Sequence, residues 1–371
     1  MSKSTELVIR ITNIGKITFV KTTNKIIKIS STLIVIWLSV LITACGSDGT
    51  NSENTETINT LFSARYSHEV VRFNDGSGDK LWLIGGLDGA HRNDVWSSSD
   101  GVTWIEEITN AAFSARNDHR VVSYNNGSGN KLWLIGGFDG VSKKNDVWSS
   151  SDGVTWIEET GNAAFSARQA HQVVTYNDGS GDKLWLIGGD DGTSTLPGNN
   201  DVWSSSDGST WIEETTSATF SPRIDHQVVS FNNGSGDKLW LIGGFEIDAF
   251  MALTLTNDVW STSDGVNWVE ETSGAEFSAR NEHQIVRFNN GSGDKLWLIG
   301  GNDGITKNDI WSSSDGVHWT EETTSASFSG RYDHRVVRFN NGDGDKLWLI
   351  GGYFGEYKND IWFTSNGVDW Q

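Results

Sequence analysis

Lys80-Leu81-Trp82-Leu83-Ile84-Gly85-Gly86 decides the fold, because the same seven residues occur six times along this 371-residue chain. The Gly-Gly doublets that end the copies lie at 85–86, 136–137, 188–189, 243–244, 300–301 and 351–352. The repeated unit starts at Phe62, Phe113, Phe165, Phe220, Phe277 and Phe328, so successive repeats are 51, 52, 55, 57 and 51 residues apart. A period of about 50 residues predicts an array of similar structural units.

Each repeat has the pattern of a four-stranded antiparallel meander. Short apolar and β-branched segments end in turns rich in Gly, Asn, Asp and Ser, which is typical of strands joined by hairpins. In the first repeat the predicted strands A to D are 68–73, 80–84, 94–98 and 102–106, with turns at 74–79 and 99–101. A single such sheet cannot bury both of its faces, whereas sheets arranged radially cover one another.

The composition agrees with this arrangement. The chain has 42 Gly, only 2 Pro and 19 Trp, and 18 of these Trp occupy the repeat positions of Trp82, Trp96 and Trp104. Large aromatic rings at regular positions are expected to dominate the packing between sheets. The predicted fold class is all-β, a six-bladed β-propeller of four-stranded antiparallel blades.

The Gly-Gly doublet after an apolar strand, followed by two spaced aromatic residues, resembles the kelch motif over residues 62–371. The C–D turn Ser98-Ser99-Asp100-Gly101 also resembles the Asp-box of sialidase-type propellers, although it lacks the residue usually found between Asp and Gly. Both resemblances imply a propeller. The expected blades are 62–112, 113–164, 165–219, 220–276, 277–327 and 328–371.

The first 61 residues have a different character. Lysines precede a short apolar run, 33–38, and Ile42-Thr43-Ala44-Cys45 resembles the lipobox of bacterial lipoproteins, in which the Cys is lipidated and becomes the N-terminus. We expect a lipoprotein signal peptide at 1–44, then lipidated Cys45 and a flexible tether at 45–61. This implies export to the bacterial outer membrane or cell surface, while an ordinary signal peptide with an incidental Cys is the alternative.

Charge and cysteine content exclude some functions. The formal net charge is −20, and removal of the basic residues 1–44 leaves the remainder at −25. Such a surface repels nucleic acid. Because Cys45 is the only cysteine, the exported part has no disulfide framework. No cofactor motif occurs, and no spacing of residues matches a known metal-binding motif. The turn Asp75-Gly76-Ser77-Gly78-Asp79 has alternating oxygens like those of calcium-binding loops. It lacks the bidentate Glu that should follow, so a tight hairpin is favoured.

The connections between strands B and C are candidates for binding because they vary in length while the other turns hardly do. They span 87–92, 138–144, 190–199, 245–256, 302–307 and 353–358. Variable loops on a rigid frame often carry binding sites. The longest contains Phe245, Phe250 and Met251 and would form an apolar contact patch if exposed; the alternative is that it folds over its own blade.

The start of strand A carries Arg-x-x-His in every repeat. The residues are Arg65 and His68, Arg116 and His119, Arg168 and His171, Arg223 and His226, Arg280 and His283, and Arg331 and His334. One interpretation is a cationic ring for an acidic ligand. The other, which we favour, is that the arginines pair with the aspartates that open strand C, because a feature repeated six times is what a blade needs.

Between each Arg and His the residues differ, and four repeats place a carboxylate there. Asp118, Asp225, Glu282 and Asp333, with Tyr332 beside the last, are expected near an axial opening where they would hold a cation or a polyol.

The sequence favours a cell-surface binding or scaffold module for a protein or glycan over an enzyme. Galactose oxidase has a kelch-type propeller, but its copper chemistry needs a Tyr-Cys crosslink that Cys45 cannot supply. Sialic acid mutarotases are similar six-bladed proteins, so a carbohydrate-active enzyme of that kind, or a diverged sialidase-like protein, remains the alternative. No phosphate loop or nucleophile elbow occurs.

Overall fold

The computed structural model describes residues 8–11, 17–20, 61–193, 198–247 and 252–371. Cys45 with its lipobox, the tether up to residue 60, Phe250 and Met251 lie outside them. The chain forms two compact parts, Met1–Glu56 and Thr57–Gln371. In the first, β1 (Val8–Ile11) pairs antiparallel with β2 (Ile17–Val20). All regular structure in the described residues is β, and they contain no helix long and apolar enough to cross a membrane.

The first repeat shows how the sequence produces a sheet. β3 (Glu69–Asn74), β4 (Asp79–Leu87), β5 (His91–Ser98) and β6 (Ile105–Ile108) pair antiparallel in chain order. Strands B and C are longer than predicted, because a register shift at the Gly-Gly doublet lets pairing continue to Leu87 and His91. Strand D starts later than predicted, because the Asp100 carboxylate accepts the N–H groups of Val102 and Thr103 (2.8 and 2.7 Å) and extends the turn.

The other repeats have equivalent strands. They are β7 (Arg120–Asn125), β8 (Asn130–Phe138), β9 (Lys143–Ser150), β10 (Ile157–Thr160), β11 (Gln172–Asn177), β12 (Asp182–Gly189), β13 (Asn199–Ser205), β14 (Ile212–Thr215), β16 (Gln227–Asn232), β17 (Asp237–Ile247), β18 (Leu253–Thr262), β19 (Val269–Thr272), β20 (Gln284–Asn289), β21 (Asp294–Asn302), β22 (Thr306–Ser313), β23 (Thr320–Thr323), β24 (Arg335–Asn340), β25 (Asp345–Tyr353) and β26 (Tyr357–Thr364). The short β15 (Arg223–Ile224) pairs with both β13 and β17 and so links repeats three and four into one sheet. In repeat six, Gln371 exchanges two backbone hydrogen bonds with Phe363 where strand D begins in the other repeats.

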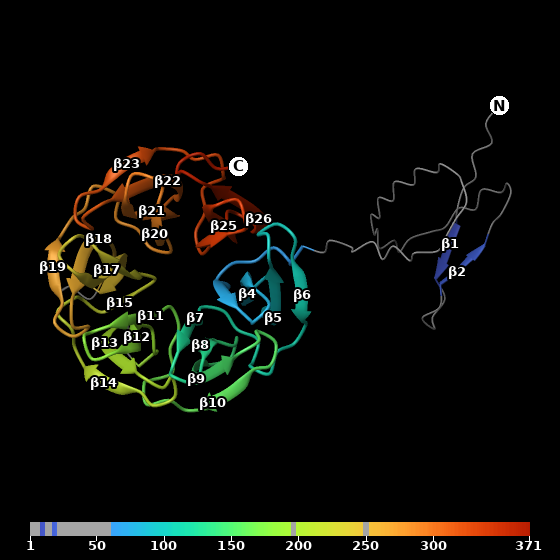
Figure 1. The fold of residues 1–371 in the computed structure, drawn as a ribbon, viewed down its shortest axis with the longest axis horizontal. Coiled ribbons are helices and arrows are strands. Elements are labelled where there is room, and N and C mark those ends of the chain that lie inside the picture. Colours follow the sequence, from blue (N-terminus) through green and yellow to red (C-terminus); the bar gives the residue numbers. More distant parts are fainter. Residues whose placement is uncertain (1–7, 12–16, 21–60, 194–197, 248–251) are drawn as a thin grey trace. The chain divides into compact units, whose positions relative to one another are not determined.

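The sheets of Thr57–Gln371 stand around a common centre (Figure 1). The first long strand of each repeat contacts its counterparts in a closed circle, in the order β3, β7, β11, β16, β20, β24 and back to β3. We call this part the ring domain. Because strands alternate in direction, the A–B and C–D turns lie on one side of it, and the B–C connections and D–A segments on the other. We call the second side the loop face.

The core lies between neighbouring repeats. The cluster between repeats one and two contains Trp82 from the first and Leu132, Leu134 and Trp156 from the second. The same kind of cluster joins repeats six and one, where Trp348 packs with the residues around Trp104. Burial of about 150–250 Å² per indole, at about 25 cal/mol per Å², contributes roughly 4–6 kcal/mol for each Trp before entropy is counted.

Candidate functional site

The Arg-x-x-His arginines are built into the loop-face side of the sheets, as Arg280 illustrates. Its Nη1 donates to Gly300 O and Asp309 Oδ1 (2.9 and 2.7 Å), Nη2 donates to Asp309 Oδ2 and Ser278 Oγ (2.7 and 2.8 Å), and Nε donates to Ser278 O (3.0 Å). Equivalent bidentate pairs are Arg65–Asp94, Arg116–Asp146, Arg168–Asp201, Arg223–Asp258 and Arg331–Asp360. These arginines are at most 1 % exposed and have no N–H left for an external carboxylate. The geometry favours the structural role over a cationic ring.

The histidines of the motif are fully buried and pack against the glycine doublets. A Cβ on Gly85 would lie 2.9 Å from His119 Cε1, and one on Gly137 would lie 2.7 Å from His119 Cβ. His68, His119, His171, His226, His283 and His334 all occupy this position. Burial, and then the nearby arginines, lowers the pKa of each imidazole, to about 3 for His283. These neutral imidazoles are buried between repeats and pack against the glycine doublets.

The residues before these histidines form a hydrogen-bonded circle around the centre of the ring. Ser67, Asp118, Ala170, Asp225, Glu282 and Asp333 all have φ between 50 and 55°. The N–H of each donates to the carbonyl of its predecessor at 3.2–3.3 Å, and Ser67 N–H donates to Asp333 O to close the circle. The four carboxylates of this circle lie close enough to repel one another and form one axial group.

These axial carboxylates are unusual acids. Withdrawal from solvent, followed by repulsion from Asp118, raises the pKa of Asp333 to about 7. Withdrawal from solvent also raises the pKa of Asp118, and with repulsion between carboxylates it raises the pKa values of Asp225 and Glu282 well above their usual range. Within the described residues, no three His, Cys, Asp or Glu side chains are arranged to hold a metal ion.

The residues that follow the buried histidines form an ion-pair group that was not predicted from the sequence. Glu69 Oε1 accepts from Arg120 Nη1 (2.8 Å) and from Arg335 Nη2 (2.7 Å), so one carboxylate joins three repeats. These residues line a cavity of about 120 Å³ together with Gln172, Gln227 and Gln284. In the sequence, the residue after each His of the motif is charged in three repeats and is Gln in the other three. This pattern was the only sign in the sequence of an ion-pair group here.

Tyr332 belongs to a group of tyrosines beside the axial carboxylates. Tyr66 stacks on Tyr357 with ring centroids 5.6 Å apart and planes 11° apart, and Tyr353 lies between Tyr66 and Tyr332 at 5.6 and 5.4 Å. Tyr357 is 36 % exposed, and the adjacent Phe354 is 45 % exposed. We call the four tyrosines the tyrosine cluster; only the B–C connection of repeat six contributes two of them.

The B–C connection of repeat four is not the twelve-residue loop that the sequence predicts. Phe245, Glu246 and Ile247 continue strand β17 and pair with Leu255, Thr254 and Leu253 of β18. The prediction of a loop was wrong because the alternating Phe245-Glu246-Ile247 and Leu253-Thr254-Leu255 segments pair as an extension of the hairpin. Phe245 is half-buried.

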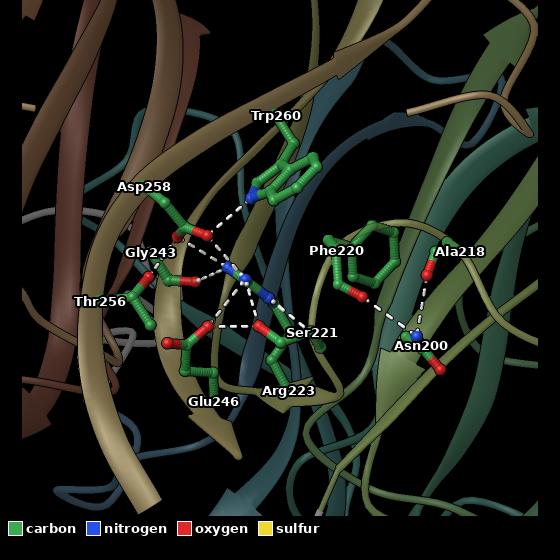
Figure 2. Close-up of polar contacts among 10 residues, drawn as sticks. All are labelled: Asn200, Ala218, Phe220, Ser221, Arg223, Gly243, Glu246, Thr256, Asp258 and Trp260. Atoms are coloured by element: carbon green, nitrogen blue, oxygen red, sulfur yellow. Dashed lines mark hydrogen bonds and ion pairs between the residues drawn. The ribbon is translucent and has the colours of Figure 1, made fainter. Parts of the chain in front are cut away.

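A cavity of about 440 Å³ lies at the base of this hairpin. Its lining includes Glu246, Thr256, Asp258 and the indole of Trp260, with Thr219, Ser221, Leu255, Asn257, Glu270 and Ser273 around them. Figure 2 shows the polar contacts beside it, where the Arg223 guanidinium lies between Asp258 and Glu246. Trp260 Nε1 donates to Asp258 Oδ2 at 2.6 Å. Glu270 and Ser273 are exposed, so the cavity opens to solvent beside strand D. We call it the repeat-four cavity.

The calcium-like turn of repeat one has internal partners. Asp75 Oδ2 accepts from Lys80 Nζ at 2.8 Å, and Asp75 Oδ1 accepts from the N–H and hydroxyl of Ser77. Burial opposes ionisation, but these hydrogen bonds outweigh it and lower the pKa of Asp75 to about 2. The carboxylate already has a cation and two donors, which agrees with a tight hairpin.

Comparisons with known proteins agree with this architecture. The sequence model of a family described as the DUF6242 beta propeller domain matches residues 39–204, less than half of the chain. The fold is a β-propeller. The solved structure of YjhT superposes with a TM-score of 0.58 over 83 % of this chain and 97 % of its own, at 16 % identity, a likeness that shows the fold alone. No curated protein matches the chain.

Proposed function

We propose that this chain is a surface-anchored binding module: a six-bladed, kelch-like propeller, held to the bacterial outer membrane by lipid on Cys45, that binds a protein partner on its loop face. The observation that carries this proposal is the repeat-four cavity. It is large enough for a side chain, opens to solvent, and lies where the repeat departs most from its neighbours. The symmetric Arg, His and Asp residues are occupied in holding the frame together, which leaves asymmetric positions for recognition.

The test exchanges one connection for another. Residues 245–256 are replaced by the six-residue connection 302–307 of repeat five, and the matched control replaces 353–358 of repeat six with the same segment. We expect both chimeras to melt as the native protein does. Only the repeat-four chimera should lose the partners that crosslinking to the native protein identifies in an envelope fraction. Equal capture by the native protein and the repeat-four chimera would refute this location.

A second candidate, glycan binding, is favoured by the tyrosine cluster. Aromatic rings beside carboxylates and hydroxyls suit the apolar faces and hydroxyls of sugars. A glycan array should show binding that Tyr353→Ala and Tyr357→Ala remove, while the repeat-four chimera keeps it. Catalysed anomer exchange of sialic acid by the same protein would instead indicate the enzymatic alternative.

The lipid anchor has its own test. Labelling with palmitate should modify the native protein and leave Cys45→Ala unlabelled and soluble. Labelling of Cys45→Ala, or membrane retention without label, would exclude this anchor.

A further inference from the structure

The repeat-four cavity lies where other repeats place a basic side chain of their own. The backbone carbonyl at this position accepts the N–H of the next arginine of the Arg-x-x-His motif around the ring, as Lys144 O does from Arg168 and Lys307 O from Arg331. In repeat four, Thr256 O accepts from Arg280 in the same way (3.0 Å). Thr256 is therefore the structural equivalent of Arg92, Lys144, Lys307 and Lys358.

In those four repeats the basic group neutralises a carboxylate of the B–C connection. The contacts are Arg92–Asp88 at 2.8 Å, Lys144–Asp139 at 2.5 Å, Lys307–Asp303 at 2.7 Å and Lys358–Glu356 at 2.8 Å. Burial raises the pKa of the strand C carboxyl Asp309, but Arg280 and, to a smaller extent, Lys307 outweigh it and lower that pKa. Each of these sites thus holds two acids and two bases.

Repeat three has Asn199 at this position, and its equivalent acid, Asp191, accepts a hydrogen bond from Ser166 Oγ at 2.9 Å. Lys143 of repeat two lies 2.6 Å from the preceding Asp190, so a neighbouring repeat brings a cation to this connection.

Repeat four keeps the two acids and lacks the second base at this position. Glu246 and Asp258 both contact Arg223, at 3.4 and 2.7 Å, so the single positive charge serves two carboxylates. Burial opposes ionisation of Asp258, but Arg223 outweighs it and lowers the pKa of that carboxyl, which stays charged at neutral pH. Exposed Glu270 at the mouth adds further negative charge.

We propose that the repeat-four cavity binds a lysine side chain of the protein partner, whose ammonium group takes the place that the chain's own lysine takes in repeats two and five. This inference rests on the proposed binding function. The Trp260 ring and Leu255 provide an apolar wall for the lysine methylenes, and Glu246 is the carboxylate for the charged end. Asp258 already accepts from Arg223, Thr256 Oγ1 and Trp260 Nε1, so it contributes negative charge to the cavity and not a direct contact.

A titration of the full-length protein labelled with ¹⁵N at tryptophan tests this directly. The probe is Nα-acetyl-lysine-N-methylamide, and the reporter is the indole N–H of Trp260, assigned with Trp260→Phe. We expect a saturable shift, and at least about tenfold weaker binding of the Nε-acetylated probe, which has lost its charge. Equal responses to both probes would overturn the proposal, as would saturable binding of glucosamine at Trp260 without binding of the lysine probe.

Three variants ensure that the test does not depend on the folding of any single variant. Thr256→Lys restores the missing base and should abolish the response, whereas Thr256→Ser should keep it. Lys307→Thr removes the base from repeat five and should create a second site, reported by the Trp311 indole, which donates to Asp309 at 2.9 Å. A folded Lys307→Thr protein without a response at Trp311, or undiminished binding by Thr256→Lys, would refute the mechanism.

Failure of this inference is distinguishable from failure of the proposed function. If Thr256→Lys still captures the partner while the repeat-four chimera does not, the loop face binds by contacts other than lysine recognition. If the repeat-four chimera still captures the partner, the binding function is not at this location.

Discussion

Substitution of Gly301 by Ala, compared with Gly291→Ala, measures what the glycine doublet contributes. Both glycines have φ of +99°, a left-handed value that disfavours alanine, so each variant carries a backbone cost. The surroundings differ. A Cβ on Gly301 would lie 2.7 Å from His283 Cβ and 2.8 Å from Asn281 O, whereas a Cβ on Gly291 meets nothing within 4 Å.

Only the Gly301 variant adds the steric contact with His283 and Asn281. Overpacking of a rigid site costs about 1–3 kcal/mol, so we expect Gly301→Ala to be about 2 kcal/mol less stable than Gly291→Ala. With about 2.1 cal/mol/K of unfolding entropy per residue over about 310 residues, this corresponds to a melting temperature about 3 °C lower. Differential scanning calorimetry of both variants gives the result. Equal melting temperatures would show that the His283 backbone yields freely and that the doublet is not a packing requirement.

Three further predictions follow from the charges. Asp309→Asn removes the partner of fully buried Arg280 and should lower the free energy of unfolding, measured in denaturant, by about 3–5 kcal/mol. As the control, Asp294→Asn breaks a surface pair with Arg287 and should cost less than about 1 kcal/mol. Similar values for the two variants would contradict the structural role of the repeated pair. The folded-state pKa of Asp333 is raised from 3.8 to about 7, so the protonated carboxyl stabilises the fold at low pH and this stabilisation is lost as the pH rises through about 7. Asp333→Asn should therefore raise the melting temperature at about pH 8 and flatten the decline in melting temperature that the native protein shows above about pH 5. An unchanged pH profile would exclude the axial carboxylates as the source of that decline. Because Asp75 already pairs with Lys80, a chelator should leave the melting temperature unchanged, and a fall on addition of EDTA that calcium reverses would indicate a metal site after all.

The sheets were predictable because their signal is local and repeated. Lys80 to Gly86 alternates between the two faces of a strand, and its recurrence with the same Trp positions indicates sheets that pack on one another. The Arg280–Asp309 pair was expected because both residues lie at the same edge of their sheet. The extended hairpin at Phe245 was missed because chain length between two predicted strands does not distinguish a loop from a longer hairpin.

The axial circle could not be predicted in detail from the residues that form it. Asp118 tolerates left-handed φ, as Asp often does, but Ala170 and Glu282 have no such preference. Their conformation is imposed by the neighbours on either side, since each N–H must reach the carbonyl of the preceding repeat. The carboxylate group is thus a property of ring closure, and no single repeat contains the information for it.

Repetition also determines where recognition can develop in this molecule. A side chain present in every repeat, such as Arg280, is already saturated by its own sheet, so changing it affects the frame before it affects any ligand. Thr256 is different, because the carbonyl at this position keeps its hydrogen bond to the next repeat whatever side chain it carries. Thr256 therefore leaves the frame intact, while Glu246 and Asp258 share the one guanidinium of Arg223. In this repeat protein a binding site is therefore expected where one repeat departs from the side chains that the others share, as repeat four does at Glu246, Leu255 and Thr256.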